Sequence, residues 1–242
     1  MKKPSSRDVS LVPPNRFPLP DATFDYPAYY FAAPRDEVFK FVPPGSRRVL
    51  EVGCGSGAFR AHFASETEYW GIEPRESPAN DAAKRLTKVL LGSFHDRLAE
   101  LPEAYFDLVI INDVIEHMRD YREFLLAVQK VMAPGAVIVG SVPNVRLVSN
   151  LARLLIKRDW EYLDAGILDY THLHFFTQKS LTRELKKAGF NIERLEGINA
   201  LGSTEHGLPK FLKTVASSAV SLLMGSDTRF VQFAFRAKLP DY

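Results

Sequence analysis

Short apolar runs alternate along the chain with stretches in which apolar residues recur at helical spacing. The run from Phe106 to Asn112 is almost wholly apolar, as expected of a central parallel strand that is buried on both faces. The run from Phe230 to Ala237 alternates in its middle, which suits a final strand that enters the sheet antiparallel. The strands predicted in this way cover residues 49–52, 68–73, 88–92, 106–112, 136–142, 190–196 and 230–237.

Helices are predicted between most of these strands. One apolar stripe begins near Tyr121 and ends before Pro134, and another helix is expected to take Ser77 as its cap and Pro78 at its first position. The predicted helices cover residues 30–41, 58–64, 77–86, 120–133 and 178–188.

The chain is long enough for one substantial core, since it has 242 residues of which 46% are hydrophobic. Residues 1–28 carry six prolines and little periodicity, which predicts an irregular arm before a single domain at 29–242. Residues 145–176 lack a strand and are too long for a simple connection, so we expect a functional insertion that selects the substrate.

Three alternating glycines follow the first predicted strand. Gly53, Gly55 and Gly57 have no Cβ, so they can adopt positive φ and leave room for an adenosyl group or a phosphate against the main chain. The predicted helix that follows would point its first amides at this loop. The string also satisfies the dinucleotide fingerprint if Ala58 replaces the last glycine, so the glycines alone do not identify the cofactor.

Two acids narrow the choice of cofactor. Glu51 precedes the first glycine by two residues, where a carboxylate would repel a pyrophosphate but attract the ammonium or sulfonium of S-adenosylmethionine. Glu73 ends the second predicted strand about twenty residues beyond the glycines, where βαβ cofactor folds place a carboxylate on the ribose hydroxyls. The alternatives are an ordinary tight turn and a surface glutamate.

The string from Glu51 to Gly57 matches in full the E-x-G-x-G-x-G first motif of class I S-adenosylmethionine-dependent methyltransferases, and the sequence resembles this family over residues 45–240. The resemblance implies a Rossmann-like α/β fold: a seven-stranded, mostly parallel sheet with helices on both faces and the last strand antiparallel. It also implies S-adenosylmethionine as cofactor. The implied cofactor-binding residues are Glu51, Gly53, Gly55, Gly57, Glu73, Pro74, Ser93, Phe94, Asn112 and Asp113.

Ser93 departs from the family pattern, in which an acid often follows the third strand and accepts from the adenine amino group. Phe94 is then expected either on the purine face, with Asp96 supplying polarity, or in the core. Arg35 could meet the cofactor carboxylate, although we expect it to be solvated.

The acceptor is expected at the carboxyl edge of the sheet, beside Asn144 and Tyr170. The candidates for the base that removes its proton are His172, His174 and His117, because histidine titrates near neutral pH. His172 is preferred because Asp169 lies close enough in sequence to orient its ring, and the alternative is a structural role for these histidines. No metal is expected, since two histidines without a clustered acid pair are weak evidence for one.

The segment DYTHLHFFTQKSLTRELKKAGF is similar to the D-x-T-H-x-x-F-F segment of methyltransferases associated with bacterial cell-surface glycan and polysaccharide assembly. We therefore expect O-methylation of a sugar or another small hydroxyl-bearing acceptor in glycan assembly. The alternatives are a nicotinamide-dependent oxidoreductase on the same sheet and an inactive, methyltransferase-like scaffold protein.

A cytoplasmic protein is expected, since no signal peptide or membrane-spanning run is visible. The net charge of +2 is too small to indicate nucleic acid as a partner. Leu208 to Met224 is predicted to form an amphipathic helix with lysines at its first turns. It could contact an anionic membrane weakly at the inner face, join two subunits of a homodimer, or pack on its own sheet.

Overall fold

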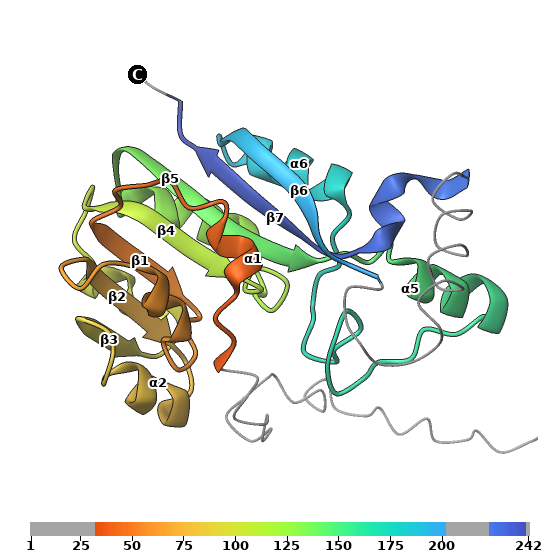
Figure 1. Ribbon diagram of the computed structural model, residues 1–242, viewed down its shortest axis with the longest axis horizontal. Helices are drawn as coiled ribbons and strands as arrows, with labels where there is room; N and C mark the ends of the chain where they lie inside the picture. The colour runs from red at the N-terminus through yellow and green to blue at the C-terminus, as the bar shows by residue number, and fades with distance from the viewer. Residues whose placement is uncertain (1–31, 202–222, 241–242) are drawn as a thin grey trace, which may run out of the picture.

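The computed structural model describes residues 32–201 and 223–240 (Figure 1). Seven strands form one sheet in the order β3-β2-β1-β4-β5-β7-β6. Neighbouring strands from β3 to β5 are parallel, whereas β7 runs antiparallel to both β5 and β6. This confirms the predicted sheet. The strands are β1 (Arg48–Val52), β2 (Glu68–Glu73), β3 (Lys88–Leu91), β4 (Phe106–Asn112), β5 (Met132–Pro143), β6 (Asn191–Ala200) and β7 (Phe230–Lys238).

Short helical segments connect the strands. The α-helices are α1 (Asp36–Phe39), α2 (Glu76–Ala82), α3 (Phe94–Arg97), α4 (Tyr121–Ala127), α5 (Val148–Ala152) and α6 (Gln178–Lys187). The 3-10 segments are η2 (Ala58–His62), η3 (Leu98–Glu100), η4 (Val128–Lys130) and η6 (Ser226–Arg229), and η5 (Arg153–Lys157) is a π-helix.

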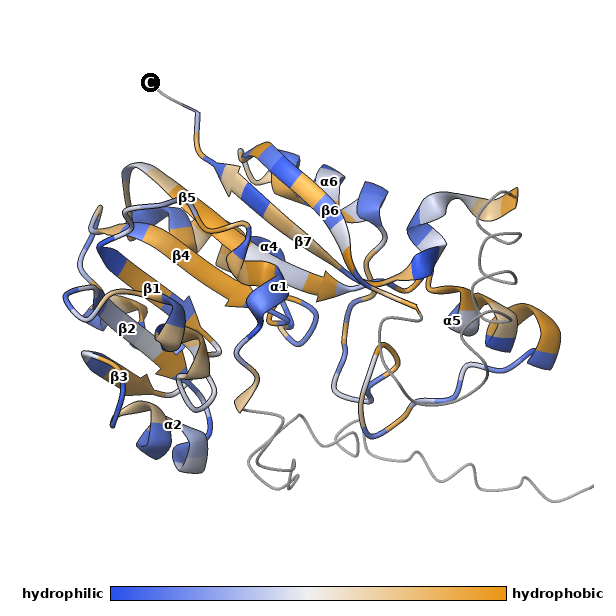
Figure 2. Cartoon of the chain, viewed as in Figure 1, coloured by the Kyte–Doolittle hydropathy of each residue, from blue (hydrophilic) through white to orange (hydrophobic). Residues whose placement is uncertain are grey.

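The core lies on both faces of the sheet, because side chains of successive strand residues point to opposite faces. Leu50 of β1 packs in one cluster with side chains of α4 and α6, and Val49 packs in the other with side chains of α1, η2 and α2. The central strands are apolar along most of their length, as Figure 2 shows for β4 and β5. The expected helices on both faces are thus confirmed.

Several predicted helices are shorter than expected. The segment after the glycine loop is the 3-10 helix η2, which begins after Gly57 in the left-handed region, so it does not present α-helical amides to the loop. Helix α2 begins at Glu76 and ends at Ala82, so Ser77 lies inside the helix and is not its cap.

Two boundaries around the expected helices also differ. Helix α1 has four residues: of the predicted stretch before it, residues 30–31 lie outside the described residues and residues 33–35 are not helical. Strand β5 starts at Met132, which pairs with Phe106 of β4. Pro134 was predicted to end the preceding helix, but it lies inside this strand.

Residues 145–176 contain α5 and η5 and no named strand. The arm at 1–28 and residues 208–222 of the predicted amphipathic helix lie outside the described residues. Among the helices that the structure describes, none is both long and apolar enough to cross a membrane.

The carboxyl ends of β1, β2 and β4 meet at one edge of the sheet, and the strand order reverses between β1 and β4. Ligands bind at such switch points in open α/β sheets. The glycine loop, Glu73 and Asn112 therefore come together although they are far apart in sequence.

Candidate cofactor and acceptor site

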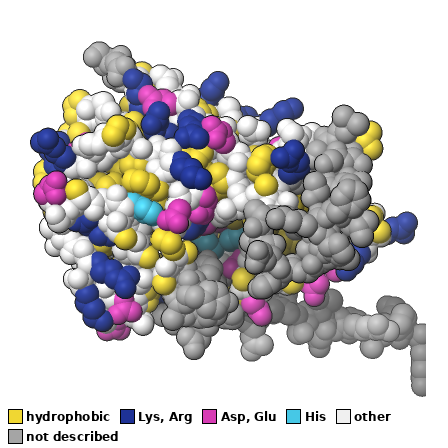
Figure 3. Space-filling view, in the orientation of Figure 1, with side chains coloured by type: hydrophobic (Ala, Val, Ile, Leu, Met, Phe, Trp, Pro, Cys, Tyr) yellow, Lys and Arg dark blue, Asp and Glu magenta, His cyan; other side chains and the backbone are white. Residues whose placement is uncertain are grey.

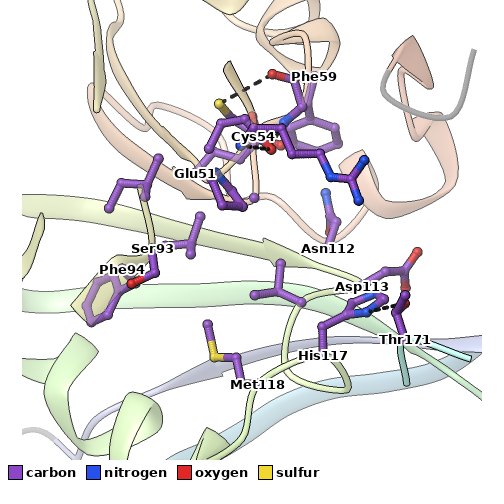
Figure 4. A pocket seen from close by; sticks show the side chains of 18 of the residues that line it. Glu51, Cys54, Phe59, Ser93, Phe94, Asn112, Asp113, His117, Met118 and Thr171 are labelled. Carbon is purple, nitrogen blue, oxygen red and sulfur yellow. Dashed lines mark hydrogen bonds between the residues drawn. The ribbon is translucent and has the colours of Figure 1, made fainter. Parts of the chain in front are cut away.

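A cavity of about 690 Å³ lies at this edge of the sheet (Figure 4). Its lining comes from the glycine loop, the ends of β2 and β4, the start of α3 and the segment that follows β4. Pockets for small molecules and cofactors typically measure about 300–1,000 Å³, so this cavity has room for a cofactor and an acceptor group. Of the expected cofactor-binding residues, all but Gly57 line it.

The glycine loop has the backbone that only glycine adopts readily. Gly53, Gly55 and Gly57 have φ values of 71°, 52° and 74°. A Cβ on Gly53 would lie 2.9 Å from the Val114 side chain, and one on Gly57 would lie 3.3 Å from the backbone of Ala82. Gly57 therefore serves the close packing of loop and helix, while Gly53 and Gly55 line the cavity.

Glu51 is a buried carboxyl group at one side of the cavity. Only 4% of the residue is exposed, and the Tyr69 hydroxyl donates a 2.8 Å hydrogen bond to it. Burial raises the pKa of Glu51 to about 8, and the hydrogen bond from Tyr69 offsets part of this rise. A positively charged ligand group placed here would favour the ionised form.

Glu73 holds the glycine loop in place from the end of β2. Its carboxylate accepts from the backbone N–H of Gly55 at 2.9 Å and from that of Arg75 at 3.0 Å, one on each oxygen. An ionised carboxylate has about four lone-pair sites, so both oxygens can still accept hydroxyl donors from the cavity. Only 4% of Glu73 is exposed.

Asn112 is the last residue of β4, Asp113 follows it, and both line the cavity. The side-chain oxygen and nitrogen of Asn112 are buried and have no hydrogen-bond partner among the described residues. A buried amide normally has partners, so its place in the cavity lining indicates a polar ligand.

The carboxylate of Asp113 is held from three sides. It accepts from Ser141 at 2.9 Å, from Gln232 at 2.7 Å and from the Arg35 guanidinium. Burial alone would raise the pKa of Asp113, but the charge and hydrogen bond of Arg35 outweigh it and the pKa lies below its usual value. The expectation of a solvated Arg35 is wrong, because these partners on β5 and β7 enclose its side chain, which is 18% exposed.

Ser93 and Phe94 mark the side of the cavity at α3. Ser93 caps α3 in a capping box with Asp96, which explains why a serine stands here. Phe94 is 2% exposed and contacts Phe124 edge-on with ring centroids 4.8 Å apart, so core packing accounts for it although it also lines the cavity. Asp96 is engaged by Ser93 and does not line the cavity.

His117 lies at the end of the cavity opposite Glu51 (Figure 4). Its Nδ1 is 2.9 Å from the hydroxyl of Thr171, which in turn donates to Asp169 at 2.7 Å. Burial, and secondly the nearby His172, lower the pKa of His117 to about 4, so the ring is neutral at pH 7. A carboxylate, a hydroxyl and an imidazole thus form a chain that ends at the cavity.

His172 and His174 do not line the cavity. His172 is buried, and its Nδ1 contacts the backbone carbonyl of Ile167 at 2.9 Å, while Nε2 of His174 lies 3.3 Å from that of Arg119. Asp169 does not orient His172 as expected, because the turn at 169–172 directs its carboxylate to Thr171.

The two expected substrate residues also lie elsewhere. Tyr170 does not line the cavity. Asn144 is fully buried, and its amide donates to the backbone carbonyls of Asp227 and Phe230 at 2.8 and 2.9 Å while its oxygen accepts from the Arg146 N–H. Asn144 therefore joins the end of β5 to the segment before β7.

Replacing Asn144 with alanine should destabilise the fold by about 1–3 kcal/mol, because the part-buried carbonyls of Asp227 and Phe230 would lose their donor. Urea unfolding followed by circular dichroism measures this. Asn150→Ala is the matched control, since its side chain makes one long contact of 3.5 Å, and we expect a change within about 0.5 kcal/mol. Equal stability of the wild type and Asn144→Ala would contradict the structural role.

Sequence reasoning missed Thr171 and Met118 as lining residues and gave Arg35 the wrong surroundings. The sequence did contain an indication for Thr171. It lies two residues after Asp169, the spacing at which an aspartate side chain hydrogen-bonds the backbone in an Asx turn. No signal in the sequence indicated the partners of Arg35, which lie 78 and 106 residues further along the chain.

A family model described as a methyltransferase domain matches residues 26–195. The chain belongs to this methyltransferase family. A probable S-adenosylmethionine-dependent methyltransferase of Mycolicibacterium smegmatis is 30% identical over 63% of this chain and 55% of that protein. A ubiquinone biosynthesis O-methyltransferase of Acinetobacter baylyi is 25% identical over 66% of this chain and 70% of that protein. The chain spans 55–56% of the length of the mycobacterial relatives that it matches.

The fold is similar to that of a S-adenosylmethionine-dependent methyltransferase from Archaeoglobus fulgidus, with a TM-score of 0.63 and 22% identity over 88% of this methyltransferase and 94% of that chain. Together with the family match, this confirms the methyltransferase family and fold predicted from the first motif.

Proposed function

We propose that this methyltransferase transfers a methyl group from S-adenosylmethionine to a hydroxyl group of a small acceptor. The observation that carries the proposal is the two-ended cavity: the glycine loop with Glu51 and Glu73 lies at one end, and the His117–Thr171 pair lies at the other. The first end suits a cationic nucleoside, and the second offers polar contacts to a hydroxyl.

The residues present fit S-adenosylmethionine. Gly53 and Gly55 let a ligand approach the backbone, Glu73 offers lone pairs to vicinal ribose hydroxyls, and the unpartnered amide of Asn112 suits the polar methionine end. Glu51 would stabilise a positive charge. When bound, the cofactor supplies an electrophilic methyl group on a sulfonium.

The protein's own task is then to align an acceptor oxygen, exclude water and remove one proton. His117 and Thr171 are neighbouring polar side chains at the far end of the cavity, and we assign acceptor binding to them in place of Asn144, Tyr170, His172 and His174. The name of the Acinetobacter relative supports oxygen as the methylated atom. The DYTHLHFF segment supports a sugar in glycan assembly.

Mass spectrometry of surface glycans from a deletion strain tests the acceptor directly. We expect loss of one methyl group, 14 Da, from a defined sugar, and restoration by the wild-type gene but not by a variant that cannot bind cofactor. If the glycan profile is unchanged and a different methylated small molecule is missing from the deletion strain, the proposed methyl transfer would stand and the proposed glycan acceptor would be wrong.

The raised pKa of Glu51 predicts a pH dependence of cofactor binding. Below pH 8 the free carboxyl is mostly protonated, so binding a cation releases a proton and affinity rises as the pH increases towards about 8. Calorimetry in two buffers of different ionisation enthalpy measures the released proton. The cofactor ammonium also titrates here, so Glu51→Gln is the control, and proton release equal to that of the wild type would contradict the role of Glu51.

A further inference from the structure

Three potential ligand side chains converge behind the acceptor end of the cavity. One ring nitrogen each of His117 and His172 and one carboxylate oxygen of Glu116 all lie within 4.8 Å of one another. His117 lines the cavity, whereas Glu116 and His172 lie behind it and are 0% and 6% exposed. Figure 3 shows histidine and acidic side chains exposed on this face, but Glu116 is fully buried and is not among the side chains seen there.

The backbone holds the two segments of this cluster together. The carbonyl of Glu116 accepts from the N–H groups of Leu173 and His174, at 2.8 and 3.1 Å. The insertion therefore brings His172 to the loop after β4 through main-chain hydrogen bonds, which makes the arrangement of the three side chains independent of surface contacts.

The hydrogen bonds of the two rings fix their tautomers. A carbonyl oxygen only accepts hydrogen bonds. Nδ1 of His172 therefore carries a proton and donates to the carbonyl of Ile167, and Nε2 keeps its lone pair. Thr171 donates its hydroxyl proton to Asp169, so it accepts from Nδ1 of His117, and Nε2 of His117 keeps its lone pair as well. A second hydrogen bond that fixes the ring in this way is typical of metal-binding histidines.

Glu116 adds a third acceptor without a donor. Both of its carboxylate oxygens are buried and have no hydrogen-bond partner among the described residues. An ionised carboxylate buried in this way is unfavourable unless an opposite charge or hydrogen-bond donors compensate it. Two imidazole rings, each with a nitrogen lone pair left free by its hydrogen bond, thus lie close to a buried carboxyl group.

We propose that Glu116, His117 and His172 bind a divalent first-row transition-metal cation such as Zn²⁺ or Mn²⁺. Two nitrogen ligands favour such a metal over Mg²⁺ and Ca²⁺, which prefer oxygen. Three protein ligands leave a further coordination position, as in catalytic sites. The expectation that no metal is needed considered His172 and His174 without a clustered acid pair, whereas the cluster in the structure joins His172 to His117 and to one acid, Glu116.

The role of the cation rests on the proposed function. Because His117 lines the cavity, a cation held by these residues would lie next to the acceptor end, where it would lower the pKa of an acceptor hydroxyl as it does for bound water. The O–H bond breaks and its proton passes to water. The oxygen lone pair forms the O–CH₃ bond while the S–CH₃ bond breaks and its electron pair stays on sulfur.

Cobalt binding tests the site without any acceptor. The full chain is stripped with a chelator and titrated with Co²⁺, whose visible absorption reports nitrogen ligation, and Zn²⁺ displacement gives its affinity. We expect one equivalent in the wild type and affinity at least tenfold weaker in Glu116→Gln and in His172→Ala. His174→Ala is the matched control, because His174 neighbours the site without belonging to it, and it should bind as the wild type does.

Cofactor calorimetry on the same samples shows that each variant is folded. A wild type that binds no Co²⁺ or Zn²⁺, or folded Glu116→Gln and His172→Ala variants that bind it unchanged, would overturn the site. Turnover that is lost on chelation and restored by Zn²⁺ or Mn²⁺ supports the role, and full turnover in chelator overturns it. If the protein binds no S-adenosylmethionine either without metal or with metal bound, that result would instead count against the proposed function.

Discussion

Replacing Gly55 with arginine should abolish S-adenosylmethionine binding while the protein stays folded. Gly55 lines the cavity with a φ of 52°, and its N–H donates to Glu73, so a long side chain here would occupy the adenosyl end of the site. The backbone strain costs about 1–2 kcal/mol, which a domain tolerates when its free energy of unfolding is the usual value of about 5–15 kcal/mol. Isothermal titration calorimetry should show at least a roughly 100-fold weaker Kd, or no binding.

Gly45→Arg is the matched control for this variant. Gly45 has a φ of 83°, so arginine there introduces the same kind of backbone strain, but a Cβ would meet nothing within 4 Å and the residue does not line the cavity. Its cofactor affinity should equal that of the wild type. If a folded Gly55→Arg variant bound the cofactor as Gly45→Arg does, the glycine loop would not be the cofactor site.

The sheet could be predicted because its strands satisfy local rules. A parallel strand buried on both faces must be apolar throughout, and β4 has that pattern without any help from its neighbours. The cofactor end of the site follows from the same rules, since Glu51, the glycine loop and Glu73 each stand at the carboxyl end of a predicted strand.

The acceptor end could not be predicted, because it depends on where side chains point after irregular turns. Asp169, Thr171 and His172 lie within four residues of one another in sequence. Asp169 accepts a hydrogen bond from Thr171, which lines the cavity, whereas the His172 ring lies outside the lining and contacts the carbonyl of Ile167. Asn144 follows β5 at the expected edge, but its amide is used by backbone carbonyls over eighty residues away. Sequence spacing cannot show such long-range partners.

Replacing His117 with alanine should lower kcat by about 100-fold or more, because a positioned group that assists proton removal typically contributes about 10²–10⁴-fold. The change removes the histidine at the acceptor end of the cavity, and it breaks the chain from Asp169 through Thr171. The Kd for S-adenosylmethionine should change by less than about threefold, since the glycine loop, Glu51 and Glu73 lie at the other end. Single-turnover kinetics and calorimetry measure the two quantities separately.

His174→Ala separates the loss of a cavity residue from a general effect on this segment. His174 contacts the Tyr121 ring and the carbonyl of Arg119, outside the cavity, so its kcat should stay within about twofold of the wild type. His117 acts at the acceptor end either by contacting the acceptor itself or by holding the proposed cation, so this prediction holds in both cases. Near-normal kcat in His117→Ala at saturating cofactor would remove His117 from the acceptor site and leave the positioning of the acceptor to Thr171 and backbone groups.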